Sequence, residues 1–322
     1  MTYTSGGLIQ ATDYNGFVST TSGANVNTVW GAGSGDSGWG QSALATVSAT
    51  NTVTATQWAS LVNTLVSMGA HTGTTITART APTAGQTIGI LAALNTDLTN
   101  ITANRQNAVA NGTQFTGWTG TNSKTAATSG SPWSITFTNT VTWASADAAR
   151  YFFNAGGRIK IDVSKSATGA TGDPEWNDLA NTLCGDIFIT GGSATQTIAG
   201  TSYTGTTKIG GGGTPNILLT TTGWNDLTAG AAGTIVYKQF ADTAPYTANF
   251  IQHTIAKGAS SNTLVITTLW SASDGDPISG GTASSGATPG TAPTTIVTYF
   301  PPSSTNLPTT SWGTPTVAAT TA

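Results

Sequence analysis

Charged side chains are scarce in this sequence. Only 7% of its 322 residues are charged, against roughly 25% in typical soluble domains, and the formal net charge is −3. Binding to nucleic acid through the phosphates needs clustered Lys and Arg, so this composition excludes an electrostatic nucleic-acid binder. Low charge also favours self-association. A chain tolerates it if assembly consumes its surfaces, or if Thr, Ser and Asn supply neutral hydration.

Side chains with reactive chemistry are equally few: one Cys, two His and a single Glu. Cys184 alone can form neither an intrachain disulfide nor a zinc cluster. His71 follows an expected helix end and His253 lies in a strand-like run, and no G-x-S-x-G elbow places a nucleophile near either one. A lone His is usually a structural group. We therefore expect no enzyme, no catalytic residue and no cofactor.

Targeting signals are absent from the sequence as well. The stretch MTYTSGGLIQ contains neither a basic nor an apolar region, which predicts no secretory signal. No run approaches the roughly 20 apolar residues that span a bilayer. We therefore expect no membrane insertion.

What the sequence does have is a glycine-rich segment, GAGSGDSGWGQ, that carries the letters of a cofactor motif. Gly33, Gly35 and Gly38 match G-x-G-x-x-G. That fingerprint requires a preceding strand, a following helix and an acidic residue about 20 positions later. Here a helix is expected to end near Trp30, order resumes at Val53, and no acidic residue stands at that distance. The pattern indicates a linker between helices.

Helical spacing dominates residues 1–112. Thr54 and Gln57 have the spacing of a capping box before an apolar run. The start of this helix, Ala55–Trp58, repeats Ala11–Tyr14 with an offset of 44 residues, and aliphatic residues follow each aromatic. A third helical segment is expected over residues 87–109.

Apolar residues in two of these helices follow alternating steps of three and four residues. Such a seam is typical of coiled coils, although neither stretch reaches the three to four heptads that identify one. Two interpretations remain: helices that pack within their own domain, or a short oligomeric bundle with a trimer favoured. The candidate interface comprises Trp58, Leu61, Leu65, Met68, Leu91, Leu94, Leu98 and Ile101.

From Trp133 onwards the pattern changes to alternation, which favours strands. Turns bearing Gly and Pro separate strand-like runs as far as Phe300, and short helices are expected after Ser145 and at Asp173. The predicted fold class is α+β, with an N-terminal helical region and then a β-rich, sandwich-like domain that has one or two short helices. The predicted divisions are a helical docking or oligomerisation region (1–112), a linker (113–132), the β-rich domain (133–300) and an extended C-terminal tail lying on a neighbouring subunit (301–322).

Carboxylates cluster at two places, Asp173, Glu175 and Asp178, and again Asp274 and Asp276. Paired carboxylates cleave glycosidic bonds in depolymerases, and carboxylate oxygens also bind calcium. However, the first cluster suits a helix N-terminus and the second is a turn signal. Neither has the loop spacing of a known calcium site, so we assign no catalytic and no metal role.

The ten Trp residues are many for a chain with so little charge. Exposed Trp can stack on sugars or partner surfaces, but most are expected to anchor the core and interfaces. Trp176–Leu179 recurs as Trp224–Leu227. The recurrence reflects either an old duplication or a repeated turn chemistry in which Asn and Asp bond nearby backbone.

Several stretches give the chain a resemblance to virion structural proteins of tailed bacteriophages, particularly those of marine and cyanobacterial phages. The resemblance covers most of the length, although this chain is poorer in charge, notably in its first two helices. It implies an oligomeric, non-enzymatic component of the tail, neck or fibre apparatus, without catalytic residues. The stretches are ATDYN (11–15), Val26–Gln41, Thr54–Leu65, Ser145–Gly157 and Tyr246–Phe250.

The sequence therefore predicts a structural component of a bacteriophage virion, located in the virion and acting through contacts with itself, as a homo-oligomer, and with other virion proteins. The alternative is a host-surface adhesin whose β domain recognises glycans through exposed Trp. A third class is a depolymerase that uses Asp178 or Asp276.

Overall fold

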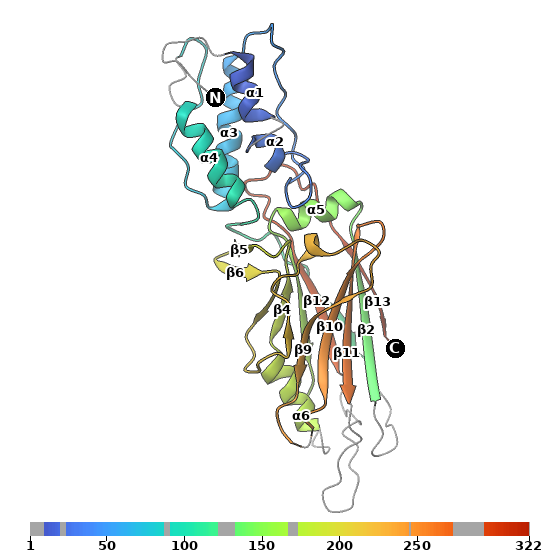
Figure 1. Ribbon diagram of the computed structural model, residues 1–322. Helices are drawn as coiled ribbons and strands as arrows, with labels where there is room; N and C mark the ends of the chain where they lie inside the picture. The colour runs from blue at the N-terminus through green and yellow to red at the C-terminus, as the bar shows by residue number, and fades with distance from the viewer. Residues whose placement is uncertain are drawn as a thin grey trace, which may run out of the picture.

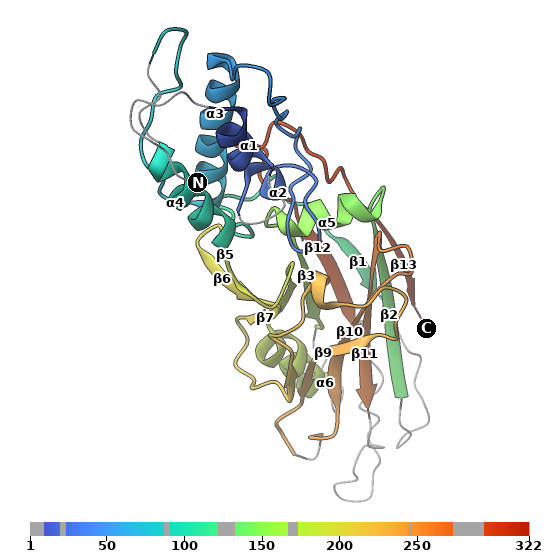
Figure 2. The same ribbon diagram turned by 45° about the horizontal axis from the view of Figure 1, so that its top comes forward.

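The computed structural model describes residues 10–19, 24–86, 91–121, 133–166, 173–244, 246–272 and 293–321. It confirms the predicted fold class, because N-terminal helices are followed by antiparallel sheets with short helices. Figure 1 shows an elongated molecule with the N-terminal helices at one end and the β-rich body at the other. Helix α5 (Ala146–Asn154) lies between the two parts in this view and in the rotated one (Figure 2).

The helices begin at local sequence signals. At the start of α3, the backbone N–H of Thr54 donates to Oε1 of Gln57 at 2.8 Å, and the backbone N–H of Gln57 donates to Oγ1 of Thr54 at 3.3 Å, which is the predicted capping box. Ser145 accepts a hydrogen bond from the backbone N–H of Ala148 at the start of α5. The helices are α1 (Ala11–Val18), α2 (Val26–Val29), α3 (Ala55–Thr72), α4 (Leu91–Ala103), α5 (Ala146–Asn154) and α6 (Asp173–Asp178), which continues as the π-helical turn η1 (Leu179–Cys184); a 3-10 turn, η2, spans Trp224–Asp226.

The two stretches that repeat with an offset of 44 residues meet in the helical region. They begin α1 and α3, as predicted. The rings of Tyr14 and Trp58, which occupy the same place in the two copies, are in edge contact with centroids 5.5 Å apart, and Phe17 approaches the same indole at 6.3 Å. The repeated pattern thus produces two helices whose aromatic faces pack on each other.

Helix α4 packs beside α3 but ends earlier than predicted. Residues 104–106 form a turn, and Ala108, expected in the helix, makes a β-bridge with Ile198. Asp97 in α4 accepts the backbone N–H of Thr77 and forms a buried ion pair with Arg79. This pair fixes α4 to the segment that leaves α3.

The strands form two large antiparallel sheets and one hairpin. One sheet has the order β1 (Trp118–Thr121), β12 (Thr294–Phe300), β3 (Arg158–Ser164), β4 (Asp186–Ile189), β7 (Thr206–Ile209). The other has the order β13 (Thr316–Thr321), β2 (Trp133–Thr142), β11 (Thr263–Ala272), β10 (Phe250–Lys257), β9 (Thr234–Phe240), β8 (Ile217–Leu218). The hairpin pairs β5 (Thr195–Ile198) with β6 (Thr201–Thr204).

The two large sheets bury alternate residues in one shared core. Ile135 and Phe137 of β2 and Ile159 and Ile161 of β3 are at most 1% exposed and belong to one hydrophobic cluster. The same cluster continues into the helical region, where it includes Trp58. This arrangement is the sandwich-like body that the alternating pattern predicted.

Two segments for which the sequence predicted no strand form sheet edges. β1 lies within the predicted linker, and β13 lies within the predicted tail. Thr316 stands opposite Thr142 of β2, so the tail pairs with its own chain rather than with a neighbouring subunit. On the way to β13 the chain passes the helical region, where Gln41 and Thr309 exchange hydrogen bonds of 2.7 and 2.9 Å.

Candidate functional site

The glycine-rich loop, residues 31–41, lies where the helical region meets the β-rich body. It follows α2 and continues without a helix until α3, so its interpretation as a connector is confirmed. Gly33 and Gly38 have φ of +53° and +96°, and a Cβ on Gly38 would lie 2.1 Å from the carbonyl oxygen of Ala32. These two glycines are required because the loop folds back on itself. Gly35 has a φ of +56°, but a Cβ built on it would meet no atom within 4 Å.

Trp39 anchors this loop between the two parts of the molecule. Its indole N–H donates to the carbonyl oxygens of Arg105, at 3.0 Å, and Asn154, at 3.1 Å. The ring is fully buried and lies edge-on to Trp30 and His71, with centroids 6.3 and 4.9 Å away. One side chain therefore connects the loop, the turn after α4 and the end of α5.

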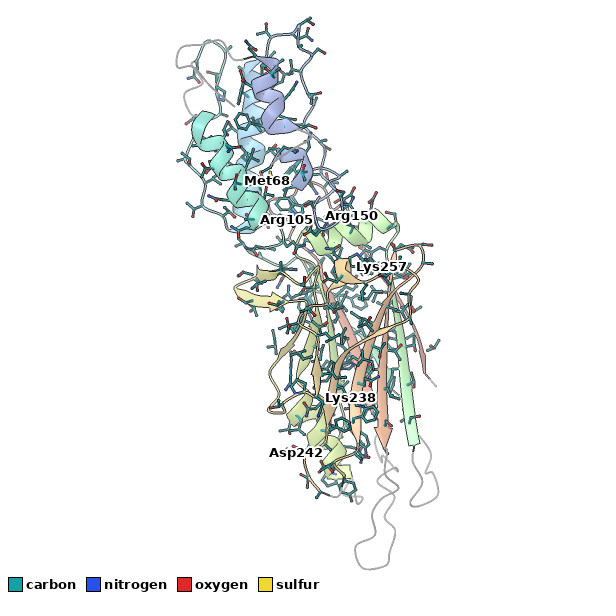
Figure 3. All side chains as sticks on the ribbon, in the orientation of Figure 1. Met68, Arg105, Arg150, Lys238, Asp242 and Lys257 are labelled. Atoms are coloured by element: carbon teal, nitrogen blue, oxygen red, sulfur yellow. The ribbon has the colours of Figure 1, made fainter. Side chains whose placement is uncertain are left out.

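Polar side chains from both parts hold the loop as well. The amide of Asn154 donates to the carbonyl oxygens of Gly35 and Ser37 at 3.1 and 3.0 Å. Arg150 in α5 donates to the Ser37 carbonyl at 2.6 Å, and Arg105 pairs with Asp36. Figure 3 shows Arg105 and Arg150 at this junction. The loop is consequently the joint of the molecule.

A groove of about 450 Å³ opens beside the joint, between α5, η2 and the turn after β10. The ammonium of Lys257 lies 4.5 Å from the ring centroid of Trp224; burial lowers the pKa of Lys257, while nearby Asp226 opposes that shift. Three carboxylates and two cations in one groove suit a polar, hydroxyl-rich ligand better than an apolar one. The charged residues that line it are Asp36, Asp147, Asp226, Arg150 and Lys257.

The two histidines and the cysteine are buried structural groups. Nε2 of His71 lies 3.0 Å from the carbonyl oxygen of Ala155; since a carbonyl only accepts, Nε2 carries the hydrogen. Nδ1 of His253 lies 3.0 Å from Oγ1 of Thr268. Burial lowers the pKa of His71 to about 4 and that of His253 to about 3, and it raises the pKa of the Cys184 thiol to about 12.

These shifts keep both imidazoles and the thiol neutral at pH 7, and each group lies away from the groove described above. A catalytic base or nucleophile needs a partner within hydrogen-bond reach and access to a substrate. All three groups are at most 2% exposed, so a substrate does not reach them in this structure.

Two residues of the first acidic cluster, Glu175 and Asp178, lie close together in the structure, and Asp242, which the sequence did not predict, joins them. Glu175 and Asp178 share α6, and each offers an oxygen within 4.8 Å of the other and of Asp242, which follows β9. Asp242 is distant in sequence, so spacing could not reveal it. The side chain of Asp173, and both Asp274 and Asp276, lie outside the described residues.

The predicted interface residues are buried within their own chain. The side chain of Leu91 lies outside the described residues, and the other seven are at most 2% exposed and pack in the core of α1, α3 and α4. The steps of three and four reflect helix packing within the domain, which corrects their assignment as a surface for a partner. These seven are Trp58, Leu61, Leu65, Met68 (labelled in Figure 3), Leu94, Leu98 and Ile101.

Most of the Trp side chains are buried as well. Trp118 is half-buried, and the side chain of Trp133 lies outside the described residues. An exposed Trp platform for sugars is therefore absent from the described part of the chain. The remaining eight, each at most 6% exposed, are Trp30, Trp39, Trp58, Trp143, Trp176, Trp224, Trp270 and Trp312.

Comparison of the chain with protein-family models, with curated proteins and with solved structures found no match. In the ranges that the structure describes, no helix combines the length and the apolar character needed to cross a bilayer. The site is therefore interpreted from its own residues.

Alanine substitutions at Gly38 and Gly35 should lower the free energy of unfolding by different amounts, because only a Cβ on Gly38 would clash with the backbone. Gly38→Ala should lower the free energy of unfolding by about 3 kcal/mol or more, because a new Cβ meets backbone and φ is positive. Gly35→Ala, with open space, should cost only about 1–2 kcal/mol. Urea unfolding of both variants measures the difference, and equal losses would contradict the requirement at Gly38.

Stability should depend on pH through the two histidines. In the folded chain both imidazoles stay neutral down to pKa values of about 4 and 3, whereas an unfolded His binds a proton from about pH 6.5. The unfolded state then binds more protons, so the free energy of unfolding is full above about pH 6.5 and falls as the pH drops, by up to about 1.4 kcal/mol per unit for each His.

Urea unfolding at about pH 7.5, 6.0 and 5.0 would measure this slope. His71→Gln and His253→Gln should each remove part of it, and the double variant most of it. An unchanged slope in the double variant would show that other groups are responsible.

Proposed function

We propose that this chain is a non-enzymatic structural component of a bacteriophage virion, in the tail, neck or fibre assembly, acting through homo-oligomeric and inter-subunit packing. Its partners are other copies of itself, with a trimer favoured, and other virion proteins. The support comes from the sequence resemblance, the low charge and the burial of both histidines and the only cysteine.

The observation that carries the proposal is the uncharged strand edge on one side of the body. Among the described residues β13 pairs only with β2, and β1 pairs only with β12. The two edge strands lie close to each other, and their sequences, WTGT and TVAATT, contain neither charge nor Pro. Figures 1 and 2 both draw β13 at the outer edge of its sheet.

Natural proteins protect exposed edges with charge, Pro or bulges, because an unprotected edge pairs with other chains. An edge without these devices suits a chain whose edge is covered by another subunit. Strand pairing between copies would also need no ion pairs, in keeping with the composition. The apolar seam of α3 and α4 cannot supply this contact because the chain already buries it.

Assembly should therefore respond to one charge placed on β13. Ala318 is exposed in the edge strand, so Ala318→Lys should leave the fold intact and shift the protein from oligomer to smaller species, seen by light scattering after size exclusion. Ala70→Lys adds the same charge at an exposed position on α3 and serves as the control. A wild-type chain that stays monomeric at high concentration would contradict the proposal.

A second candidate function, recognition of a host-surface glycan, is favoured by one observation, the charged groove beside the joint. Its carboxylates and cations could bind the hydroxyls of a sugar directly. Trp224 in the groove is only 2% exposed, so the recognition would be polar rather than by the stacking on exposed Trp that the sequence suggested.

Substitution of one exposed carboxylate, Asp147, tests whether a glycan binds in the groove. Asp147→Ala should weaken binding on a glycan array by about tenfold or more if Asp147 contacts the sugar, since losing a charged hydrogen-bond partner costs about 1.5–3 kcal/mol. Asp186→Ala, which also removes an ion-paired carboxylate but lies outside the groove, should bind normally. Absence of any glycan signal in the wild type would remove this candidate.

A further inference from the structure

Three carboxylates converge at the end of the β-rich body that is remote from the helices. Glu175 and Asp178 lie on α6, and Asp242 lies in the loop that follows β9. One oxygen from each lies within 4.8 Å of the other two. Figure 1 places α6 at this end, and Figure 3 labels Asp242 beside it.

Glu175 is the unusual member of this group. The residue is only 8% exposed. Its Oε1 atom is shielded from solvent and has no hydrogen-bond partner among the described residues. A buried carboxylate oxygen normally has a partner, because leaving it unpaired costs the full desolvation of that oxygen. Among the described residues, the chain itself supplies no hydrogen-bond donor to this oxygen.

The electrostatic surroundings of Glu175 point the same way. Burial raises the pKa of Glu175, and the charges of Asp178 and Asp242 add to this shift, while the backbone N–H and the side chain of Thr243, both hydrogen-bonded to the carboxylate, act against it. The groups that act on this pKa include no cation. A bound cation would neutralise the repulsion among the three carboxylates.

The helix itself does not account for the cluster. Negative charge is favoured near a helix N-terminus, which suits Glu175. Asp242, however, comes from a different segment, and Asp178 stands at the last residue of α6. Neither gains from the first turn of this helix, so their approach to Glu175 needs another explanation.

We propose that Glu175, Asp178 and Asp242 bind one divalent cation, and that Ca²⁺ fits the site better than Mg²⁺. Ca²⁺ takes 6–8 oxygens in flexible geometry and binds several carboxylates at once, which suits three carboxylates from two segments. Mg²⁺ demands near-ideal octahedral geometry, keeps several waters and usually binds through only one or two carboxylates. The exposed side of Asp242 leaves room for water to complete the coordination of Ca²⁺.

The ion would tie the loop after β9 to α6 and η1. The hydroxyl of Tyr237 in β9 already donates to the carbonyl oxygen of Cys184 at 3.1 Å, which links the same two segments on the buried side. The cation adds a second link at the surface. This inference concerns the stability of one end of the body and does not depend on the virion proposal.

Terbium luminescence tests the site in the full-length chain. Tb³⁺ replaces Ca²⁺ at oxygen sites, and Trp176, adjacent to Glu175, can sensitise its emission. We expect emission on excitation of Trp, displacement by Ca²⁺ at lower concentration than by Mg²⁺, and a rise in the unfolding temperature with Ca²⁺.

Two variants locate the site. Asp242→Asn changes an exposed loop residue and should weaken Tb³⁺ and Ca²⁺ binding by about tenfold or more while circular dichroism stays unchanged. Glu175→Gln should abolish binding and remove the effect of Ca²⁺ on unfolding. Asp186→Asn, a carboxylate paired with Lys160, is the control and should bind as the wild type does.

Three results would overturn the proposal. The first is a wild-type chain that gives no sensitised emission. The second is a Tb³⁺ affinity that is unchanged in Asp242→Asn, which would place the ion elsewhere. The third is a Glu175→Gln variant that is more stable than a wild type indifferent to Ca²⁺, which would show that Glu175 is simply a protonated carboxyl.

Discussion

The indole N–H of Trp39, together with the hydrogen bonds of Asn154 and Arg150 to the same loop, joins the two ends of this molecule. It satisfies two backbone carbonyls, one from the turn after α4 and one from the end of α5. A buried carbonyl left without a donor costs about 1–3 kcal/mol, and the loop that carries Trp39 can reach this position only through glycines with positive φ. The same loop also bonds the segment of residues 301–315, through Gln41 to the backbone of Thr309 and through the carbonyl oxygen of Trp39, which accepts from the hydroxyl of Ser311.

Elsewhere the chain replaces charge with neutral amides. Asn15 exchanges two hydrogen bonds of 2.8 Å with the backbone of Val47, and Asn27 does the same with Leu44 at 2.9 and 2.8 Å. Gln41 bonds the backbone of Thr309 in this way. Each amide imitates one residue of a β-ladder, pairing donor with acceptor at no cost in ionic desolvation. A chain with few charges can therefore still fix its long loops.

The sequence predicted what local chemistry determines and missed what distant contacts decide. Caps and helical spacing predicted α3, and alternation predicted β2 and β3, because each signal is complete within a few residues. β1 and β13 are short, Thr-rich strands whose ladders are supplied by partners far along the chain. The apolar spacing in α3 and α4 predicted that these residues are buried, but it could not show whether the same chain or a partner covers them. Nothing near Asp242 in the sequence indicates that it approaches Glu175.

The return of the C-terminal segment to the helical region sets an order on biosynthesis. Gln41 leaves the ribosome long before Thr309 exists, and β2 acquires its outer neighbour only when residues 316–321 have been translated. Until then β2 lacks the hydrogen bonds to β13, and Gln41 lacks its partner Thr309. Completion of this part of the native topology therefore waits until residues 309–321 have been translated.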